Sequence, residues 1–289
     1  MTASPIPLFS VIVPVFRHWQ HVPGLLARLA AQAPVPGGVE ILIVDNGPAS
    51  ERPALALPAA ARLLACPEPG AYAARNLGAA SAHGRLLAFT DADCRPDPGW
   101  LAAMAEAAGR LPGRLLAGPV RLVAGEPPNS CEIYDRIRGI PQERYVRLGY
   151  ATTANLVVPR PVFDAVAGFD ARRFSGGDAD FCRRAGRAGH GIALVPTAVV
   201  EHPARADWEA LATKARRVKG GQITGGPRRL RLQWFLRTLT PPLRATARFA
   251  RAPRPWRERL TAIRVLYRLW LVELAETARL LVGGSPERR

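Results

Sequence analysis

Short apolar runs alternate with Ala- and Leu-rich segments through the first half of the chain, and this alternation limits the possible folds more than any other feature. The apolar runs that predict strands are Phe9 to Val15, Val39 to Asp45, Arg62 to Cys66 and Leu86 to Asp91. The segments that predict helices, each ending near Gly or Pro, are His18 to Gln32, Ala71 to Ala82 and Gly99 to Gly109. Such alternation is typical of an α/β class with a mostly parallel sheet and helices on both faces. Ligands of these sheets bind at the carboxyl ends of the strands.

The middle of the chain is less regular. The sequence predicts a strand over Leu115 to Ala124, an irregular polar insertion over Gly125 to Gly149, and extended structure over Thr153 to Val158. A helix over Ala179 to Ala188 and a last strand over Ile192 to Val200, bulged at Pro196, follow. Because the composition shifts to Arg, Trp, Leu and Pro beyond Pro203, we expect a catalytic domain over residues 1–205 and a tail over residues 206–289.

Length and cysteine usage exclude several classes of protein. A chain of 289 residues with 48% hydrophobic content can bury a full core without a disulfide or metal staple. The four cysteines are far apart and form no Cys-x-x-Cys pair, which favours a reducing cytoplasm over a disulfide framework or a zinc site. Neither a signal peptide nor about 18 consecutive apolar residues is present, so we expect no membrane span.

The formal charge of +17 is concentrated in the tail. Residues 203–289 hold 20 Lys and Arg against 6 Asp and Glu, and only Lys214 and Lys219 are lysines. Residues 228–251 mix aromatic and aliphatic side chains with arginines and are interrupted by Pro241 and Pro242. In Arg257 to Leu281, apolar residues recur at helical spacing and predict one amphipathic face: Leu260, Ile263, Tyr267, Trp270, Leu271, Leu274 and Leu281.

Two readings of this basic amphipathic extension stay open. Its composition suits the interface of an anionic membrane, so residues 228–281 predict peripheral attachment, on the cytoplasmic face of an inner membrane. The apolar stripe could equally dock against the catalytic domain. Clustered arginines also suit nucleic acid, but the near-neutral first 202 residues make that partner a poor expectation.

Asp91-Ala92-Asp93 places two carboxylates just beyond a predicted apolar strand. Hard carboxylate oxygens hold Mg²⁺ or Mn²⁺, and such an ion neutralises the charge that develops on a departing diphosphate. Alone, an Asp-x-Asp pattern is more often a turn or helix cap. Four further segments at strand ends or helix starts accompany it: Ser10 to Phe16, Ile41 to Gly47, Ala73 to Gly78, and Gly176 to Phe181.

In order and spacing, these five segments resemble the inverting family 2 glycosyltransferases over roughly residues 8–205. The resemblance implies the Rossmann-like GT-A fold and a nucleotide-sugar donor, with UDP the expected nucleotide. It also implies roles for single residues. Pro14, Val15 and Phe16 would line the nucleotide pocket, Asp45 would accept a hydrogen bond from the base, and Arg75 would contact the nucleotide.

The same resemblance implies a divalent cation, Mn²⁺ or Mg²⁺, with Asp93 as its direct ligand and Asp91 facing both ribose and metal. His202 matches a histidine that completes this site, and an imidazole suits Mn²⁺ better than Mg²⁺. A surface histidine at a strand end is the simpler alternative for His202.

Asp178 matches the catalytic base of the family, and Asp180 is a rival base. Positions two apart on a helix point to different faces, so both carboxylates cannot serve equally. Gly177 departs from the family pattern, where Glu or Asp usually precedes the base. Asp178 could also serve only as a helix N-terminal carboxylate. Thr153, Asn155 and Gly177 would lie near the donor sugar and acceptor.

The sequence therefore predicts an inverting, metal-dependent glycosyltransferase that acts on a glycan or lipid-linked acceptor in cell-envelope or exopolysaccharide synthesis. One alternative is a non-enzymatic protein that binds nucleic acid or a membrane surface on a degenerate transferase fold. A nucleotidyltransferase is a third possibility, but Val15 to His18 lacks the glycine expected of its phosphate loop.

Overall fold

The computed structural model describes residues 6–173, 175–225 and 227–287, and the chain forms two compact units. The first unit comprises Met1–Arg121, Pro141–Ala171 and Gly177–His202. The second comprises Leu122–Ile140, Arg172–Gly176 and Pro203–Arg289. A segment from the middle of the chain therefore belongs with the C-terminal residues. The assignment of catalysis to residues 1–205 and of a separate tail to residues 206–289 stays a prediction.

A seven-stranded sheet of order β3-β2-β1-β4-β8-β6-β9 forms the centre of the first unit. Its strands are β1 (Phe9–Val15), β2 (Val39–Asp45), β3 (Ala61–Ala65), β4 (Leu86–Phe89), β6 (Leu115–Ala117), β8 (Leu156–Pro159) and β9 (Ile192–Leu194). The first four are parallel to one another, β8 runs antiparallel to both its neighbours, and β6 pairs parallel with β9. The predicted α/β class with a mainly parallel sheet is confirmed, and the early strands agree with their predicted ranges to within two residues.

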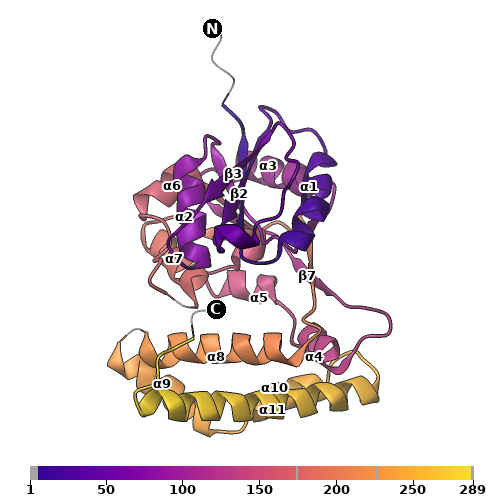
Figure 1. Ribbon diagram of the computed structural model, residues 1–289, viewed down its shortest axis with the longest axis vertical. Helices are drawn as coiled ribbons and strands as arrows, with labels where there is room; N and C mark the ends of the chain where they lie inside the picture. The colour runs from indigo at the N-terminus through magenta and orange to yellow at the C-terminus, as the bar shows by residue number, and fades with distance from the viewer. Residues whose placement is uncertain (1–5, 174, 226, 288–289) are drawn as a thin grey trace. The chain divides into compact units, whose positions relative to one another are not determined.

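Helices cover both faces of this sheet. Figure 1 shows α1 (Val22–Ala30) and α3 (Trp100–Arg110) on one side, and α2 (Ala71–Ser81), α6 (Arg160–Ala165) and α7 (Gly177–Arg187) on the other. The strands are buried on both faces because helices cover both, which explains their continuous apolar runs. Fully buried side chains of β1, β2, β4, β8 and α7 form one hydrophobic core, which includes Ile12, Leu42, Leu87, Leu156 and Phe181.

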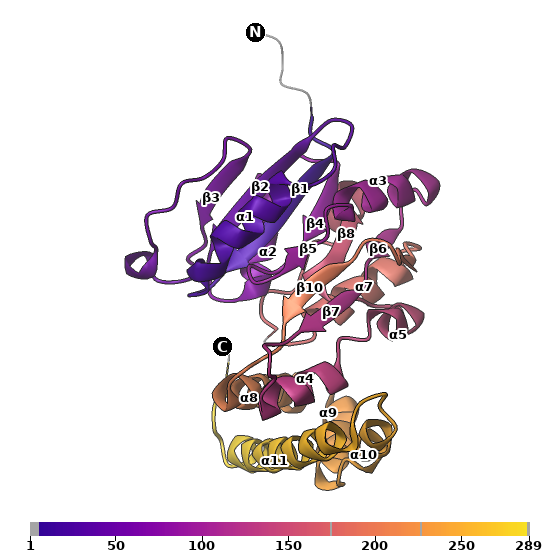
Figure 2. The same cartoon turned by 90° about the vertical axis from the view of Figure 1, so that its right-hand side faces the viewer.

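Two predicted strands are each divided in the structure. Leu115 to Ala124 becomes β6 and β7 (Val120–Val123), and Ile192 to Val200 becomes β9 and β10 (Val200–Pro203). In both cases the first part belongs to the seven-stranded sheet and the second to a three-stranded sheet of order β5-β10-β7, with β5 at Arg95–Pro96 (Figure 2). Apolar content alone does not reveal this change of sheet, so the prediction of single strands was wrong.

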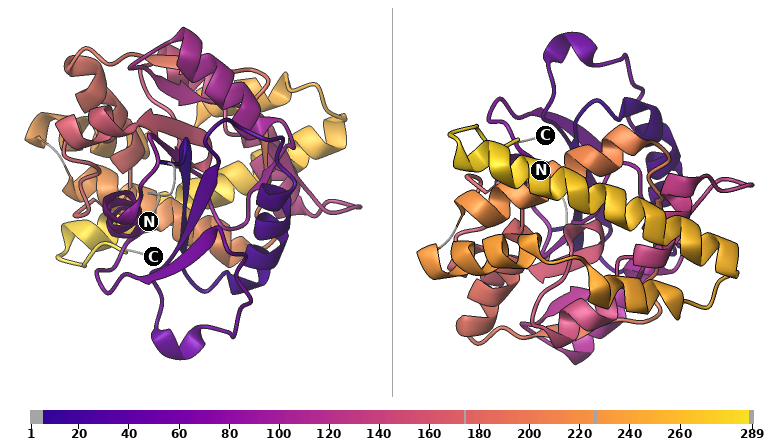
Figure 3. Two further views of the ribbon diagram at one scale, coloured as in Figure 1. Left: turned by 90° about the horizontal axis from the view of Figure 1, so that it is seen from above. Right: turned by 90° about the horizontal axis from the view of Figure 1, so that it is seen from below.

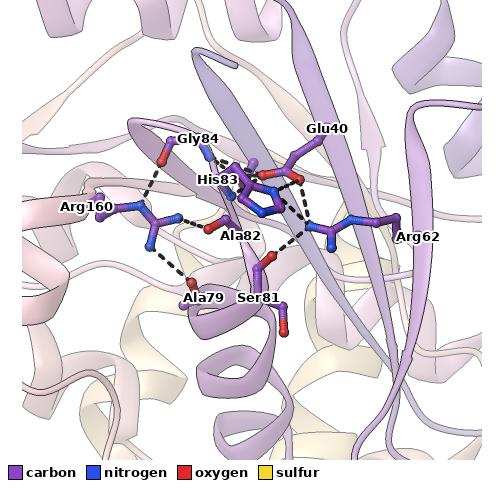
Figure 4. Close-up of polar contacts among 9 residues, drawn as sticks. Glu40, Arg62, Ala79, Ser81, Ala82, His83, Gly84 and Arg160 are labelled. Carbon is purple, nitrogen blue, oxygen red and sulfur yellow. Dashed lines mark hydrogen bonds and ion pairs between the residues drawn. The ribbon is translucent and has the colours of Figure 1, made fainter. Parts of the chain in front are cut away.

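The amino ends of the parallel strands are held by a saturated polar network (Figure 4). Glu40 accepts hydrogen bonds from Ser10 Oγ at 2.6 Å and from the Gly84 backbone N–H at 3.1 Å, and it pairs with Arg62 at 2.8 Å. Arg160 donates to the carbonyl oxygens of Gly84, Ala79 and Ala82 at 3.0, 3.2 and 2.6 Å. These contacts tie β1, β2, α2 and α6 together at this end of the sheet.

The second unit is built from helices. They are α4 (Ser130–Arg138), α8 (Trp208–Thr224), α9 (Arg228–Leu239), α10 (Leu243–Ala250) and α11 (Trp256–Leu281), and α11 contacts all the others (Figure 3). The prediction of an irregular insertion over Gly125 to Gly149 was wrong, because this range contains α4 and also α5 (Gln142–Arg147) of the first unit. Asn129 and Glu132 form a capping box that starts α4. Its side chains Cys131 and Tyr134 pack with Leu211, Phe249 and Val265.

The helices of the extension agree with the predicted ranges, but the buried face of α11 differs from the predicted one. The break at Pro241 and Pro242 separates α9 from α10 as expected. On α11 the buried residues are Ala262, Val265, Leu269, Glu276 and Thr277, whereas Leu260, Leu271 and Leu281 of the predicted stripe are exposed. Packing of α4 and α8 selects the buried face, and the helical period alone does not show which face that is. Within the described residues, no helix has the length and apolar character needed to cross a bilayer.

Candidate active site

The carboxyl ends of β1, β2 and β4 bring the first predicted site residues to one edge of the sheet. Because the strands are parallel, Val15 lies opposite Asp45 in the register of β1 and β2, and Asp91 follows β4 by two residues. Val15 is fully buried, whereas Pro14 and Phe16 are partly exposed. This is the edge where sheets of this class bind their ligands.

Asp45 is a buried acceptor at the end of β2, with 2% of its surface exposed. Its Oδ1 accepts a hydrogen bond from the Gly47 backbone N–H at 3.0 Å, and its Oδ2 pairs with Arg52 Nε at 2.7 Å. Arg52 was not predicted as part of the site, since it lies in the unpatterned loop after β2. Asp45 retains lone pairs in this arrangement and can still accept a hydrogen bond from a base.

Asn46 joins this edge to the loop before α2. Its amide donates to the carbonyl oxygens of Cys66 and Glu68 at 3.1 and 2.6 Å, and its Oδ1 accepts from the Gly70 N–H at 2.8 Å. Gly70 has φ +124°, a conformation that L side chains rarely adopt. The start of α2, which carries Arg75, is thereby fixed to the end of β2.

Arg75 and Asp91 form a short ion pair, with Nη2 2.6 Å from Oδ1. Arg75 is 5% exposed, and among the described residues its Nε has no hydrogen-bond partner. Burial alone would lower the pKa of Arg75, but the negative charges of Asp91 and Asp178 outweigh burial and raise it. This guanidinium therefore stays charged and offers a free N–H donor inside the site.

Donor atoms suited to a divalent cation gather where β10 meets the loop after β4. Atoms of Asp91, Cys94 and His202 lie within 4.8 Å of one another, and His202 Nε2 is 3.5 Å from Asp93 Oδ1. The pairing of β10 with β5, in which Glu201 lies opposite Arg95, brings His202 to this loop. Two carboxylates and an imidazole are ligands that Mn²⁺ accepts, so the residues present fit such an ion.

Cys94 was missed by the sequence analysis. Burial, followed by the charges of Asp91 and Asp93, raises the pKa of its thiol well above the usual range, and the sulfur donates to the Ala154 carbonyl at 3.8 Å. The Cys94 thiol is therefore protonated and uncharged where it borders the site. Its position directly after Asp93 is the one sequence signal that could have included it.

Asp178 lies in the first turn of α7 and acts electrostatically on Arg75, as Asp91 does. Its Oδ2 accepts hydrogen bonds from the backbone N–H and the hydroxyl of Thr153, at 3.2 and 3.4 Å. Its Oδ1 is buried and has no hydrogen-bond partner among the described residues. One oxygen therefore fixes the carboxylate, and the other is left as an unused acceptor.

Tyr72 explains why position 177 is a glycine. The Gly177 N–H donates to the Tyr72 hydroxyl at 2.9 Å, and a Cβ at position 177 would lie 2.6 Å from the Tyr72 ring. Burial, and then the negative charge of Asp178, raise the pKa of Tyr72, so the hydroxyl stays neutral. The ring of Tyr72 thus fills the space that a side chain preceding Asp178 would occupy.

The remaining predicted residues are held by the scaffold. Asp180 pairs with Arg184 at 2.9 Å, and Arg184 also donates to backbone carbonyls of Val166 and Gly168. Asn155 is fully buried, and its amide accepts from Trp100 Nε1 at 2.8 Å while donating to two carbonyl oxygens. Thr153 is buried against Asp178. Both N–H donors of Asn155 are therefore engaged within the protein.

Comparison with known proteins identifies the family. The model of the family described as Glycosyl transferase family 2 matches residues 10–175. Glycosyltransferase AglE of Haloferax volcanii is 30% identical over 227 residues, which cover 76% of this chain and 74% of that protein.

Two solved structures share the fold. The mannosyltransferase PcManGT from Pyrobaculum calidifontis, solved with GDP-Man and Mn²⁺, superposes with a TM-score of 0.57 at 16% identity, over 95% of this chain and 87% of the other. S. aureus TarS 1–349, solved with UDP-GlcNAc, gives 0.54 at 14% identity, over 96% and 92%. The alternative of a non-enzymatic binding protein is not favoured by these findings. The predicted GT-A fold is confirmed, and the chain belongs to glycosyl transferase family 2 as a sugar-transferring enzyme.

Proposed function

We propose that this enzyme transfers a sugar from a nucleoside diphosphate sugar to an acceptor hydroxyl with inversion at the anomeric carbon, and that Asp178 is its catalytic base. The unpartnered, buried Oδ1 of Asp178 is the observation that carries the proposal. A buried carboxylate oxygen without a donor is costly, and such atoms persist mainly where a ligand completes them. An acceptor hydroxyl is the donor that this oxygen lacks.

The nucleotide binds at the ends of β1 and β2 in this proposal. Asp45 accepts a hydrogen bond from the base, Pro14 to Phe16 line the pocket, and the free Nε of Arg75 donates to the nucleotide. The structural neighbours hold GDP-Man and UDP-GlcNAc, so both nucleotides are candidates, and UDP remains our first choice.

We assign the cation site to Asp93, Asp91 and His202, because His202 has donor atoms within 4.8 Å of Asp91 and 3.5 Å from Asp93. When bound, a divalent ion supplies positive charge that stabilises the departing diphosphate. Arg75 adds to this charge from the other side of Asp91, to which it is paired. Mn²⁺ accompanies the donor in the mannosyltransferase neighbour and accepts imidazole more readily than Mg²⁺ does.

Asp178 performs the proton transfer. Its Oδ1 accepts the proton of the acceptor hydroxyl as that oxygen forms a bond to the anomeric carbon, and the bond between this carbon and the diphosphate oxygen breaks on the opposite face. Thr153 holds Oδ2 and so orients the carboxylate. Asp180 is the weaker candidate because Arg184 engages its carboxylate.

An anionic membrane surface is the partner we propose for the second unit, with a glycan or lipid-linked acceptor of the cell envelope as substrate. Its helices α9, α10 and α11 carry large apolar side chains that are exposed: Leu230, Leu232, Leu236, Leu239, Leu243, Trp256, Leu260, Leu271 and Leu281. Arginines alternate with them on α9 to α11, which is the composition of an interfacial helix. Flotation with phosphatidylglycerol vesicles tests this attachment, and it should be lost in the Leu232→Asn, Leu236→Asn variant.

A donor panel tests the enzymatic proposal. Wild type and Asp93→Asn are titrated calorimetrically with UDP- and GDP-sugars in Mn²⁺ or in chelator, and the anomeric configuration of the product is read by proton NMR. We expect one nucleotide to bind only with metal, at least about tenfold more weakly in Asp93→Asn, and an inverted product. Metal-independent binding, or a retained configuration, would contradict the respective part of the proposal.

A further inference from the structure

In the second unit, three cationic side chains lie around one buried carboxylate, and a fourth lies near one of the three. Asp135 on α4 is 1% exposed, and its Oδ2 accepts hydrogen bonds from Arg205 Nη1 at 3.0 Å and from the Arg205 backbone N–H at 3.2 Å. Arg138 Nη1 lies 4.0 Å from the other oxygen. Lys214 and Arg217, one turn apart on α8, complete the group, which we name the α8 basic cluster.

The charges in the α8 basic cluster do not balance. Asp135 is already engaged by Arg205 and Arg138. Within the part of the chain that the structure describes, Lys214 forms no hydrogen bond or ion pair, and Arg217 Nε is buried without a hydrogen-bond partner. Among the described residues, Arg205, Arg138 and Lys214 therefore interact with the single carboxylate of Asp135, and Lys214 and Arg217 each keep an unused donor.

Lys219 is the only other lysine of the chain and lies on the same helix, where its charge is paired. Its Nζ lies 3.0 Å from the carboxylate of Glu273 and 2.9 Å from the Thr238 hydroxyl, and a third contact is made with Gln222 at 3.1 Å. Lys219 is thus satisfied inside the protein. Lys214 lies five positions earlier, and no carboxylate of the described residues forms an ion pair with it as Glu273 does with Lys219.

This imbalance has a physical cost in the ligand-free protein. Burial lowers the pKa of Lys214 well below its usual range, and the charges of Arg138 and Arg205 lower it further, against a smaller opposing effect of Asp135. Sheltered charges without counter-charges are unfavourable unless an anion compensates them. A multiply charged anion would meet the unused donors of Lys214 and Arg217 and relieve the repulsion.

We propose that the α8 basic cluster binds a phosphate group, with Lys214, Arg217 and Arg138 as its direct ligands and Arg205 and Asp135 as positioning residues. The fixed N–H fork of arginine matches phosphate oxygens in pairs, and lysine adds a compact charge. A phosphate group also offers more acceptor oxygens to these donors than a single carboxylate does. The phosphate can belong to a lipid headgroup or to a soluble phosphorylated molecule.

Calorimetric titration of the full chain with inorganic pyrophosphate tests the soluble form. Chelator is present throughout, so that divalent-ion-dependent binding at Asp91 does not contribute. We expect affinity to fall by about tenfold or more in Lys214→Gln and in Arg217→Gln, since each removes a charge-assisted hydrogen bond. Arg254→Gln is the matched control, because Arg254 is an exposed arginine of the same unit, and its affinity should stay within about twofold.

Vesicle flotation tests the lipid form with the same variants. Phosphatidylcholine vesicles are compared with and without phosphatidic acid, whose headgroup is a phosphate monoester. A loss in Lys214→Gln and Arg217→Gln that exceeds the loss in Arg254→Gln identifies the headgroup as the source, whereas an effect confined to pyrophosphate identifies a soluble ligand. If neither probe depends on Lys214 and Arg217 beyond the Arg254 control, the proposal is overturned.

Thermal unfolding of Lys214→Gln without anion separates a binding role from a structural one. If Lys214 is held among like charges for binding, its replacement relieves repulsion and should raise the melting temperature. If Lys214 instead stabilises the fold, its replacement should lower the melting temperature. Unchanged pyrophosphate and vesicle binding together with a lower melting temperature would overturn the proposal, whatever the activity of the variant.

Discussion

The two ends of the central sheet differ in whether their buried polar side chains have hydrogen-bond partners. At the amino end, the Glu40 carboxylate receives several hydrogen bonds and Arg160 donates to three carbonyl oxygens (Figure 4). At the carboxyl end, Arg75 Nε and Asp178 Oδ1 are buried without partners. Each end joins several elements with polar side chains, but among the described residues of these two ends the buried polar atoms without partners lie at the carboxyl end and not in the amino-end network. Unsatisfied groups reduce stability, so their concentration at one edge marks where a ligand is expected to complete them.

We expect the largest effect on the transfer rate, from a substitution at the carboxyl end of the sheet. Asp178→Asn should lower the transfer rate by ~10²- to 10⁴-fold, because the amide cannot take the acceptor proton. The donor affinity should change little, since Thr153 still holds the side chain. Initial rates and donor titrations measure both quantities. Asp180→Asn is the matched control, and a larger loss of rate there would transfer the role of base to Asp180.

A substitution at the amino end should lower the free energy of unfolding and leave the transfer rate nearly unchanged. Arg160→Met removes three hydrogen bonds to carbonyl oxygens of the α2 and Gly84 region, and we expect a loss of about 3 kcal/mol in the free energy of unfolding, roughly 1 kcal/mol for each. Urea unfolding provides the measurement. The transfer rate of the folded variant should stay within about threefold of wild type. A large loss of rate in folded Arg160→Met would break the division between the two ends.

A substitution at Gly177 tests how closely the carboxyl end is packed. The new methyl group of Gly177→Ala would lie 2.6 Å from the Tyr72 ring, so we expect a destabilisation of about 1–3 kcal/mol and a displaced Asp178. Tyr72→Leu in the same chain should recover part of the stability, because the smaller side chain makes room. A double-mutant cycle from urea unfolding measures this coupling, and strictly additive effects would contradict the proposed contact.

The smallest expected effect is the acid dependence of the amino end. Burial alone would raise the pKa of Glu40, but hydrogen bonds from Ser10, His83 and Arg62 lower it to about 2. Because the folded pKa lies below the unfolded one, its stabilising effect is present above about pH 4.5 and is lost as pH falls towards 2. After allowance for solvent screening, we expect wild type to exceed Glu40→Gln by about 1–2 kcal/mol at pH 6. Unfolding curves between pH 6 and 2.5 should converge.

Local patterns were sufficient for the parts of the site that parallel strands organise. Asp45 and Asp91 follow apolar strands, and parallel strands end at one edge, so their shared location follows from the alternation of strands and helices. The helical extension was also predictable, because the helical spacing of its apolar residues and its break at Pro241 and Pro242 are local features of the sequence. The roles of these residues stay predictions until the variants are measured.

Other features depend on contacts between distant segments. Cys94 meets His202 only because β10 pairs with β5, and the ring of Tyr72 occupies the space beside Gly177 through the packing of α2 against the start of α7. No local pattern records either contact. For the same reason, the sequence analysis missed both Cys94 and Tyr72.

The α/β class and the side chains available at the strand ends could be predicted from period and spacing along the chain, and the resemblance of five motifs indicated glycosyl transferase family 2. Packing between distant segments brings α4 to the C-terminal helices, buries one face of α11 and gives Lys219 its counter-charge at Glu273, and none of these could be predicted from local patterns. Burial and charge balance are properties of a residue's neighbours in space, and most of those neighbours are distant in sequence.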